Sequence, residues 1–189
     1  MNEIEHILSL VPTKLEYKST TSKQFKLDVY EYFNKPEFKT LNCLEIGCAK
    51  GHTTLILSKL FNKVYGVNED SCDIASEFCK SNGSLNAEFF VQDVYRFGFP
   101  NVEADIIMID AIHTYEHVYT DIKNSLKLKS KNKKYFIFDD MGLFPEVNKV
   151  VKDMCDQNVL RFIKDIGVSP DGQFHKPLNR YEGAICVEI

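Results

Sequence analysis

The chain has 189 residues, of which 44% are hydrophobic and 26% charged, values typical of one globular domain with a full apolar core. Its formal net charge of −4 gives no general attraction to nucleic acid, so we expect no nucleic-acid partner. No apolar run approaches the roughly 18 residues that span a bilayer, and the first residues lack the pattern of a signal peptide. We therefore expect a cytoplasmic protein with no membrane partner.

The first part of the chain predicts an accessory cap, and the central part predicts an alternating α/β fold. An amphipathic stretch at 22–34 predicts a helix, and we expect residues 1–40 to form a helical cap. Short apolar or aromatic runs then predict strands at 41–46, 64–67, 88–91, 105–109 and 135–138. Helical spacing predicts helices at 53–61, 72–80 and 115–128. Such alternation indicates parallel strands joined by right-handed crossovers, with helices on both faces.

The C-terminal part predicts a closing hairpin. Pro145 can begin a helix at 145–156, because proline in the first turn loses no hydrogen bond. Residues 159–166 and 181–189 then predict two strands. The expected fold is α/β: a Rossmann-like, seven-stranded, mostly parallel sheet with a C-terminal antiparallel hairpin, in one domain over 41–189. The six scattered cysteines form no C-x-x-C pair and predict reduced core thiols.

A glycine-containing turn, in LEIGCAKGHTT, follows the first predicted strand. Gly47 and Gly51 flank a tight strand-to-helix turn where side chains would block a ligand, and the next helix offers free backbone N–H groups. The spacing differs from the G-x-G-x-x-G of nicotinamide-binding proteins. The pattern E-x-G-x-x-x-G, with Glu45, instead resembles the donor-binding signature of class I methyltransferases, which use S-adenosylmethionine.

The resemblance extends over about residues 41–189 and implies further contacts to the donor. That family usually places an acid on the donor ribose at the end of the second strand. Here Asn68 stands in that position with Glu69 beside it, and the ribose contact is left open between them. Asp93, after the third strand, matches the family's polar contact to the adenine amino group; the alternative is a solvated loop aspartate.

Three aspartates follow the fourth and fifth predicted strands, in IIMIDAIHTYEH and YFIFDD. Ligands of such sheets bind beyond the carboxyl ends of the strands, so Asp110, Asp139 and Asp140 are expected at one rim. Clustered carboxylates need a cation or a proton between them, and oxygen ligands suit Mg²⁺, Mn²⁺ or Ca²⁺. Adjacent Asp139 and Asp140 reach one ion only if the strand breaks, which Gly142 favours; alternatively one of the two caps the next helix.

This arrangement resembles the metal-dependent O-methyltransferases, including the macrocin and rhamnosyl types that act on sugar hydroxyls. The resemblance implies Mg²⁺ or Mn²⁺ at Asp110, Asp139 and Asp140, with Asp110 also at the donor, and His113 as the general base. A cation lowers the pKa of an acceptor hydroxyl, and a base removes its proton during transfer. The alternative for His113 is that it only orders its loop.

Other histidines carry weaker signals. His113 and His117 form H-x-x-x-H, a spacing that places two imidazoles on one helical face for zinc. The hydrolase motif needs glutamate after the first histidine, where Thr114 stands, so we interpret Thr114 as a helix cap and His117 as a surface residue. His52 could touch the donor and His175 the acceptor, although solvated histidines are commoner.

The sequence therefore predicts an S-adenosylmethionine-dependent O-methyltransferase whose preferred acceptor is a sugar hydroxyl. A phenol or another small-molecule hydroxyl is the alternative acceptor. A non-catalytic module that only binds the donor is the alternative of a different class, and clustered acids argue against it. The expected partner is a small-molecule or glycan acceptor, and a homodimer is left open.

Overall fold

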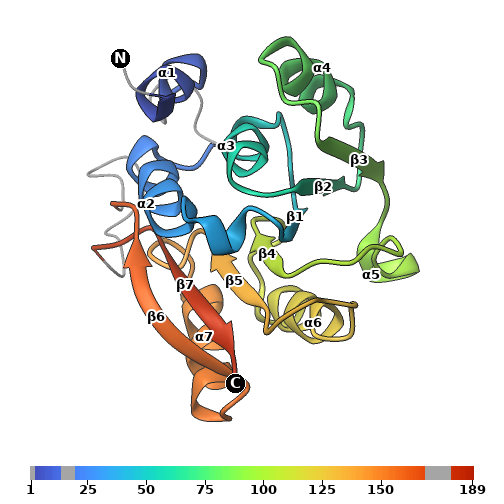
Figure 1. The fold of residues 1–189 in the computed structure, drawn as a ribbon. Helices are drawn as coiled ribbons and strands as arrows, with labels where there is room; N and C mark the ends of the chain where they lie inside the picture. The colour runs from blue at the N-terminus through green and yellow to red at the C-terminus, as the bar shows by residue number, and fades with distance from the viewer. Residues whose placement is uncertain (1–2, 14–19, 169–179) are drawn as a thin grey trace.

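The computed structural model describes residues 3–13, 20–168 and 180–189, and it confirms the predicted fold class. One seven-stranded sheet has the order β3-β2-β1-β4-β5-β7-β6, with helices on both faces (Figure 1). The first five strands are parallel, and β7 pairs antiparallel with both β5 and β6. The strands are β1 (Asn42–Ile46), β2 (Lys63–Asn68), β3 (Ala87–Val91), β4 (Ile106–Ile109), β5 (Tyr135–Phe138), β6 (Leu160–Ile166) and β7 (Gly183–Glu188).

Two apolar layers enclose the sheet because its central strands are buried on both sides. In β1, Cys43 joins the layer formed with the N-terminal helices, α3 (His52–Leu60) and α4 (Asp73–Ser81). Leu44 and Ile46 face the opposite layer, formed with α5 (Val94–Phe97), α6 (Tyr115–Ser125) and α7 (Pro145–Asp156). This alternation follows from the two-residue period of a strand, and it turns Glu45 toward the layer of α3.

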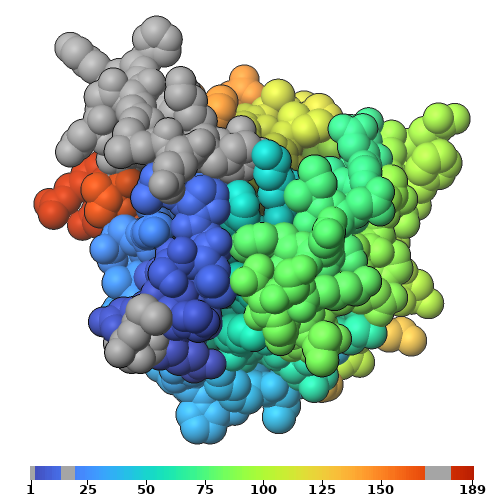
Figure 2. Space-filling view, turned by 90° about the horizontal axis from the view of Figure 1, so that it is seen from above, coloured from blue at the N-terminus to red at the C-terminus, as the bar shows by residue number. Residues whose placement is uncertain are grey.

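The N-terminal segment packs onto the sheet through an apolar helix face. It forms α1 (Glu3–Leu10), which the sequence did not predict, α2 (Lys23–Phe33), and a short 3-10 turn, η1 (Pro36–Phe38). The Ser22 hydroxyl caps α2 by accepting a hydrogen bond from the Phe25 N–H at 3.0 Å. Phe25 and Phe33 are fully buried in the layer shared with α3. Figure 2 shows this segment, in blue, against the teal and green of α3 and α4. The domain boundary at residue 41 stays a prediction.

The remaining expectations for the fold concern cysteines and membranes. All six cysteines are free and five are buried, as the sequence predicted; the Sγ atoms of Cys48 and Cys72 lie 3.9 Å apart. Among the described residues, no helix is long and apolar enough to cross a membrane. His175 lies outside the described residues.

Candidate functional site

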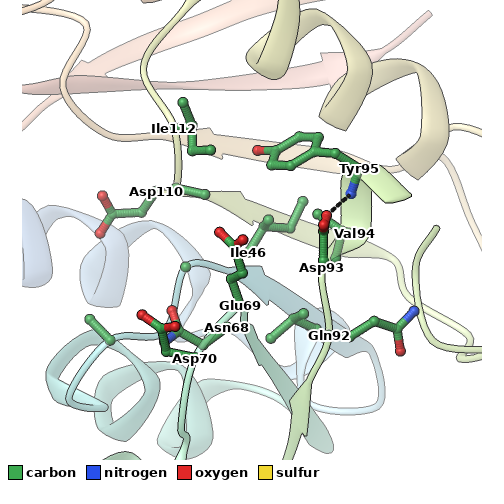
Figure 3. Close-up of a pocket in the computed structure, with 14 residues that line it drawn as sticks. Ile46, Asn68, Glu69, Asp70, Gln92, Asp93, Val94, Tyr95, Asp110 and Ile112 are labelled. Carbon is green, nitrogen blue, oxygen red and sulfur yellow. Dashed lines mark hydrogen bonds between the residues drawn. The ribbon is translucent and has the colours of Figure 1, made fainter. Parts of the chain in front are cut away.

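A cavity of about 240 Å³ opens beyond the carboxyl ends of four parallel strands (Figure 3). It lies where β1 and β4 adjoin, the point at which successive crossovers turn to opposite sides of the sheet. Such a switch point is the usual ligand site of an open α/β sheet. We call this cavity the donor pocket; it is lined by Ile46, Gly47, Ala49, Val67, Asn68, Glu69, Asp70, Gln92, Asp93, Val94, Tyr95, Asp110, Ala111 and Ile112.

The two glycines of the turn after β1 have different structural roles. Gly47 has a φ of +92° and lines the donor pocket; a Cβ there would lie 2.0 Å from the Asp110 carbonyl oxygen. Gly51 has a φ of +80° and begins α3, but its missing Cβ faces Ala75 of α4, with the nearest atom at 3.0 Å. Gly51 does not line the donor pocket. The structure therefore gives Gly51 a packing role and keeps Gly47 at the site.

Glu45 lies beneath this turn, with only 1% of its surface exposed. The Thr54 hydroxyl donates a hydrogen bond to its carboxylate. Burial raises the pKa of Glu45 to about 8; the charge of Asp110 raises it further, and the Thr54 hydrogen bond and the charge of Lys26 oppose the shift. Glu45 is outside the donor pocket but lines a neighbouring cavity.

Asn68 and Glu69 both line the donor pocket at the end of β2, with Asp70 beside them (Figure 3). Asn68 is half-buried and Glu69 is exposed. The Asn68 amide is already turned toward the Ser71 carbonyl oxygen, 3.5 Å away. Both residues line the donor pocket, and the predicted ribose contact stays open between them.

Asp93 has two roles at the end of β3. It lines the donor pocket and is half-buried, and its predicted contact to the adenine amino group stays a prediction. Its Oδ1 also accepts hydrogen bonds from the Tyr95 and Arg96 N–H groups, both at 3.0 Å, and so caps the short helix α5. The cap fixes the carboxylate at the rim of the pocket.

Tyr95 is a pocket residue that the sequence analysis missed. Its ring lines the donor pocket, and its hydroxyl donates to Asp121 Oδ2 at 3.1 Å. Asp121 is 1% exposed, and burial raises its pKa to about 7. The only signal was an aromatic residue shortly after the third predicted strand, on a four-residue helix too short for periodicity to reveal.

Three potential metal ligands gather next to the donor pocket: Asp110, His113 and Asp140. One ligand atom from each lies within 4.8 Å of the others. The His113 Nε2 lies 3.1 Å from Asp140 Oδ2 and 3.9 Å from Asp110 Oδ1. We call these residues the acid–histidine group. Asp110 belongs both to this group and to the donor pocket, so the two sites adjoin.

The regular strand conformation ends after β5 as expected, but only one of the two adjacent aspartates joins the acid–histidine group. Asp140 has a left-handed backbone with a φ of +59°, which turns its side chain to the rim. Asp139 follows the regular strand and is 4% exposed; it is not part of the acid–histidine group, contrary to the expected ligand set. Neither residue is the N-cap of α7, since Phe144 occupies that position. The sequence predicted both Asp139 and Asp140 as ligands beside Asp110. In the structure, His113 takes the place of Asp139 in the group.

The neighbouring histidine contacts argue against a zinc motif on one helix. His113 precedes α6, which begins at Tyr115, and its ring stacks on Phe144 with centroids 4.4 Å apart. His117 lies on α6, where its Nδ1 is 2.6 Å from the Thr114 hydroxyl oxygen, and it is not part of the acid–histidine group. Thr114 occupies the N-cap position as predicted, without a side-chain bond to the helix backbone.

Comparisons with known proteins agree with this fold. Residues 43–128 match a family model described as a methyltransferase domain, and no curated protein matches the chain. The O-methyltransferase TomG from Streptomyces achromogenes, involved in tomaymycin synthesis and solved with SAM, has 13% identity and a TM-score of 0.68 over 100% of this chain and 90% of its own.

Two other similar solved structures are an N-methyltransferase and a tRNA methyltransferase. The N-methyltransferase NodS from Bradyrhizobium japonicum has 17% identity and a TM-score of 0.61 over 87% of this chain and 96% of its own. The tRNA (m1A58) methyltransferase TrmI from Aquifex aeolicus has 14% identity and a TM-score of 0.65 over 99% of this chain and 76% of its own. These likenesses establish a Rossmann-like methyltransferase fold, and with the family match they support a methyltransferase.

Proposed function

We propose that this protein is an S-adenosylmethionine-dependent methyltransferase that methylates a hydroxyl, with a sugar hydroxyl as the preferred acceptor. The observation that carries the proposal is the position of Asp110, which lines the donor pocket and also belongs to the acid–histidine group. A methyl donor and a site for activating a hydroxyl must adjoin, because the two reacting atoms must come within about 3–3.5 Å.

The donor pocket fits an adenosine group. Asn68, Glu69 and Asp93 provide polar side chains at the ends of β2 and β3, and Tyr95 and Ile112 provide apolar walls. Gly47 keeps the turn after β1 close to the chain after β4, which leaves no room for a side chain at that point. S-adenosylmethionine, when bound there, supplies an electrophilic methyl group on its sulfonium. The proposed work of the chain is to orient the donor with this methyl toward the rim near Asp110.

The acid–histidine group fits a divalent cation such as Mg²⁺ or Mn²⁺, because its carboxylate oxygens are hard ligands and three ligand atoms converge. Asp110 and Asp140 would hold the cation, which lowers the pKa of a bound hydroxyl. His113 takes the acceptor proton at Nε2 in this proposal. Its ring is held in one plane by stacking on Phe144, which orients that nitrogen toward the two aspartates.

A second role for His113 follows from the same distances. Its Nε2 is itself one of the three converging ligand atoms, so His113 could be a ligand of the cation instead of the base. The two roles exclude one another, because a nitrogen lone pair that holds a metal cannot accept a proton. They differ in what the loss of His113 does to metal affinity.

The acceptor would approach over an apolar rim. Phe144 and Ile112 flank this region and are 40% and 37% exposed. An exposed ring beside the acid–histidine group suits the C–H face of a sugar, and it also suits a phenol, which is the alternative acceptor. A module that only binds the donor needs no cluster of metal-ligand atoms, so we propose an enzyme rather than a binding module.

A donor-turnover assay tests the proposal. The purified chain is incubated with S-adenosylmethionine and a panel of sugars and phenols, and formation of S-adenosylhomocysteine is measured with and without chelator. Turnover with a sugar, lost on chelation, is the expected result. Turnover only with phenols would change the acceptor class, and donor binding without turnover on any acceptor would favour the binding module.

A further inference from the structure

Tyr95 is held by hydrogen bonds at both its backbone and its side-chain end. Its N–H donates to Asp93 Oδ1 at 3.0 Å, and its hydroxyl donates to Asp121 Oδ2 on α6 at 3.1 Å. The His117 ring meets the Tyr95 ring edge-on, with centroids 4.4 Å apart. These contacts hold the Tyr95 ring in place against the donor pocket that it lines.

The Tyr95 hydroxyl also contacts the segment that follows β4. Figure 3 shows this hydroxyl pointing toward Ile112, and the Ile112 backbone N–H donates a hydrogen bond to it. That bond opposes the rise in the pKa of Tyr95 that burial causes. Ile112 lies between Asp110 and His113, two members of the acid–histidine group. The hydroxyl therefore connects the donor pocket with residues 110–113, which we call the bridging segment.

The buried Asp121 carboxyl has a partner for only one of its oxygens. Its Oδ2 accepts the hydrogen bond from Tyr95, whereas its Oδ1 makes no hydrogen bond within the described part of the chain. The hydroxyl of Ser125, one turn later on α6, is likewise buried without a partner there. A buried polar atom without a partner costs stability, which an apolar side chain of similar size would avoid. The presence of Asp121 therefore indicates that its bond to Tyr95 serves something other than stability.

We propose that Asp121 and Tyr95 are positioning residues for methyl transfer. Asp121 holds the Tyr95 hydroxyl against the Ile112 backbone and so fixes the bridging segment relative to the bound donor. Because this segment carries Asp110 and His113, the distance between the donor methyl group and the activated acceptor depends on it. The inference rests on the proposed function, which assigns the activation of the acceptor to these two residues.

Four substitutions separate the hydroxyl bond from the aromatic ring and from the charge. Tyr95→Phe keeps the aromatic wall of the donor pocket and removes the hydroxyl. Asp121→Leu removes the acceptor of that hydroxyl, whereas Asp121→Asn keeps an acceptor oxygen without the charge. Tyr119→Phe is the matched control, because Tyr119 lies on α6 but belongs neither to the donor pocket nor to the acid–histidine group.

Four quantities are measured for the unsubstituted chain and for each variant. Calorimetric titration gives the affinity for S-adenosylhomocysteine, and urea unfolding gives the stability. Hydrogen exchange, with S-adenosylhomocysteine bound, gives the rate at which the bridging segment opens. The turnover number is measured with S-adenosylmethionine and the acceptor that the panel of sugars and phenols identifies.

Tyr95→Phe and Asp121→Leu should lower the turnover number by about 10–100-fold, because a misplacement of about 1 Å at the reacting groups can cost about 10²-fold. Both should speed hydrogen exchange in the bridging segment and keep the affinity for S-adenosylhomocysteine within about threefold, because the aromatic wall stays. Asp121→Leu should unfold at the same or a higher urea concentration, because it removes a buried oxygen without a partner. Asp121→Asn should keep most of the turnover, and Tyr119→Phe should change none of the four quantities.

Two results would overturn the inference and leave the proposed function intact. One is normal turnover with normal hydrogen exchange in Tyr95→Phe, the variant that decides the question if Asp121→Leu does not fold. The other is a loss of stability and of donor affinity in Asp121→Leu that matches its loss of turnover, which would make Asp121 purely structural. If the unsubstituted chain binds the donor but methylates nothing on the panel, the proposed function fails, and the inference fails with it.

Discussion

His113 is held between an acid and an aromatic ring, and its chemical role can be separated from its structural one. Replacing it with glutamine keeps a polar group near Asp140 but removes an acceptor for the proton. If His113 is the base, the turnover number should fall by about 10²–10⁴-fold, with little change in donor affinity. Steady-state kinetics and calorimetry measure the two quantities.

Manganese binding to His113→Gln distinguishes the two roles of this residue. If His113 is only the base, its loss should leave the affinity for the metal unchanged. If His113 is a ligand, its loss should lower both the metal affinity and the turnover. Near-normal turnover in His113→Gln would reject the base and leave cation activation alone.

Glu45 should make the stability of the fold depend on pH. Burial raises its pKa from 4.5 to about 8, so between these values the folded chain keeps a proton that the unfolded chain has released. The free energy of unfolding should therefore fall as pH rises through this window, by up to about 1.4 kcal/mol per pH unit from this group. Urea unfolding of the unsubstituted chain and Glu45→Gln at several pH values measures the effect. The variant should show a shallower fall, and parallel profiles would contradict the prediction.

At the scale of the elements, Gly51 joins α3 to α4 rather than lining the donor pocket. A Cβ at this position would meet Ala75 at 3.0–3.2 Å, and the φ of +80° disfavours any side chain. Gly51→Ala should cost roughly 1–3 kcal/mol of stability through backbone strain and packing. Donor affinity in the folded fraction should change less than stability does. Chemical unfolding measures the stability, and calorimetry measures the donor affinity. A variant with full stability that cannot bind the donor would contradict the packing role and make Gly51 a donor-binding residue.

The sequence could predict elements whose signals are local. The run YFIF predicted β5 with the bounds that the structure has, and Pro145 marked the start of α7. The choice between Asp139 and Asp140 was not predictable, because it depends on the left-handed backbone at Asp140. The partners Gly51 and Ala75, or Tyr95 and Asp121, are far apart in sequence, and only the packed elements bring them together.

At the scale of the whole molecule, the donor pocket and the acid–histidine group share only Asp110, which predicts that donor binding and methyl transfer can be lost separately. Chelation should abolish methyl transfer, and added Mg²⁺ or Mn²⁺ should restore it, because Asp110 and Asp140 can hold a cation. Donor affinity should survive chelation, since most of the lining of the donor pocket comes from the ends of β1, β2 and β3. Turnover assays and calorimetry in excess chelator measure both, and undiminished turnover would remove the metal from the mechanism.

The first and last parts of the chain are tied together in the fold. The Ser22 N–H donates to both oxygens of the buried Glu182 carboxylate, at 3.0 and 3.2 Å, and the Gly167 N–H donates to Asp28 Oδ2 at 2.7 Å. During synthesis on the ribosome, α2 emerges early but waits for these partners until almost all of the chain has been translated. The contacts of Ser22 and Asp28 with Glu182 and Gly167 can therefore form only near the end of synthesis, and a chain terminated before residue 167 would leave α2 without both of these partners.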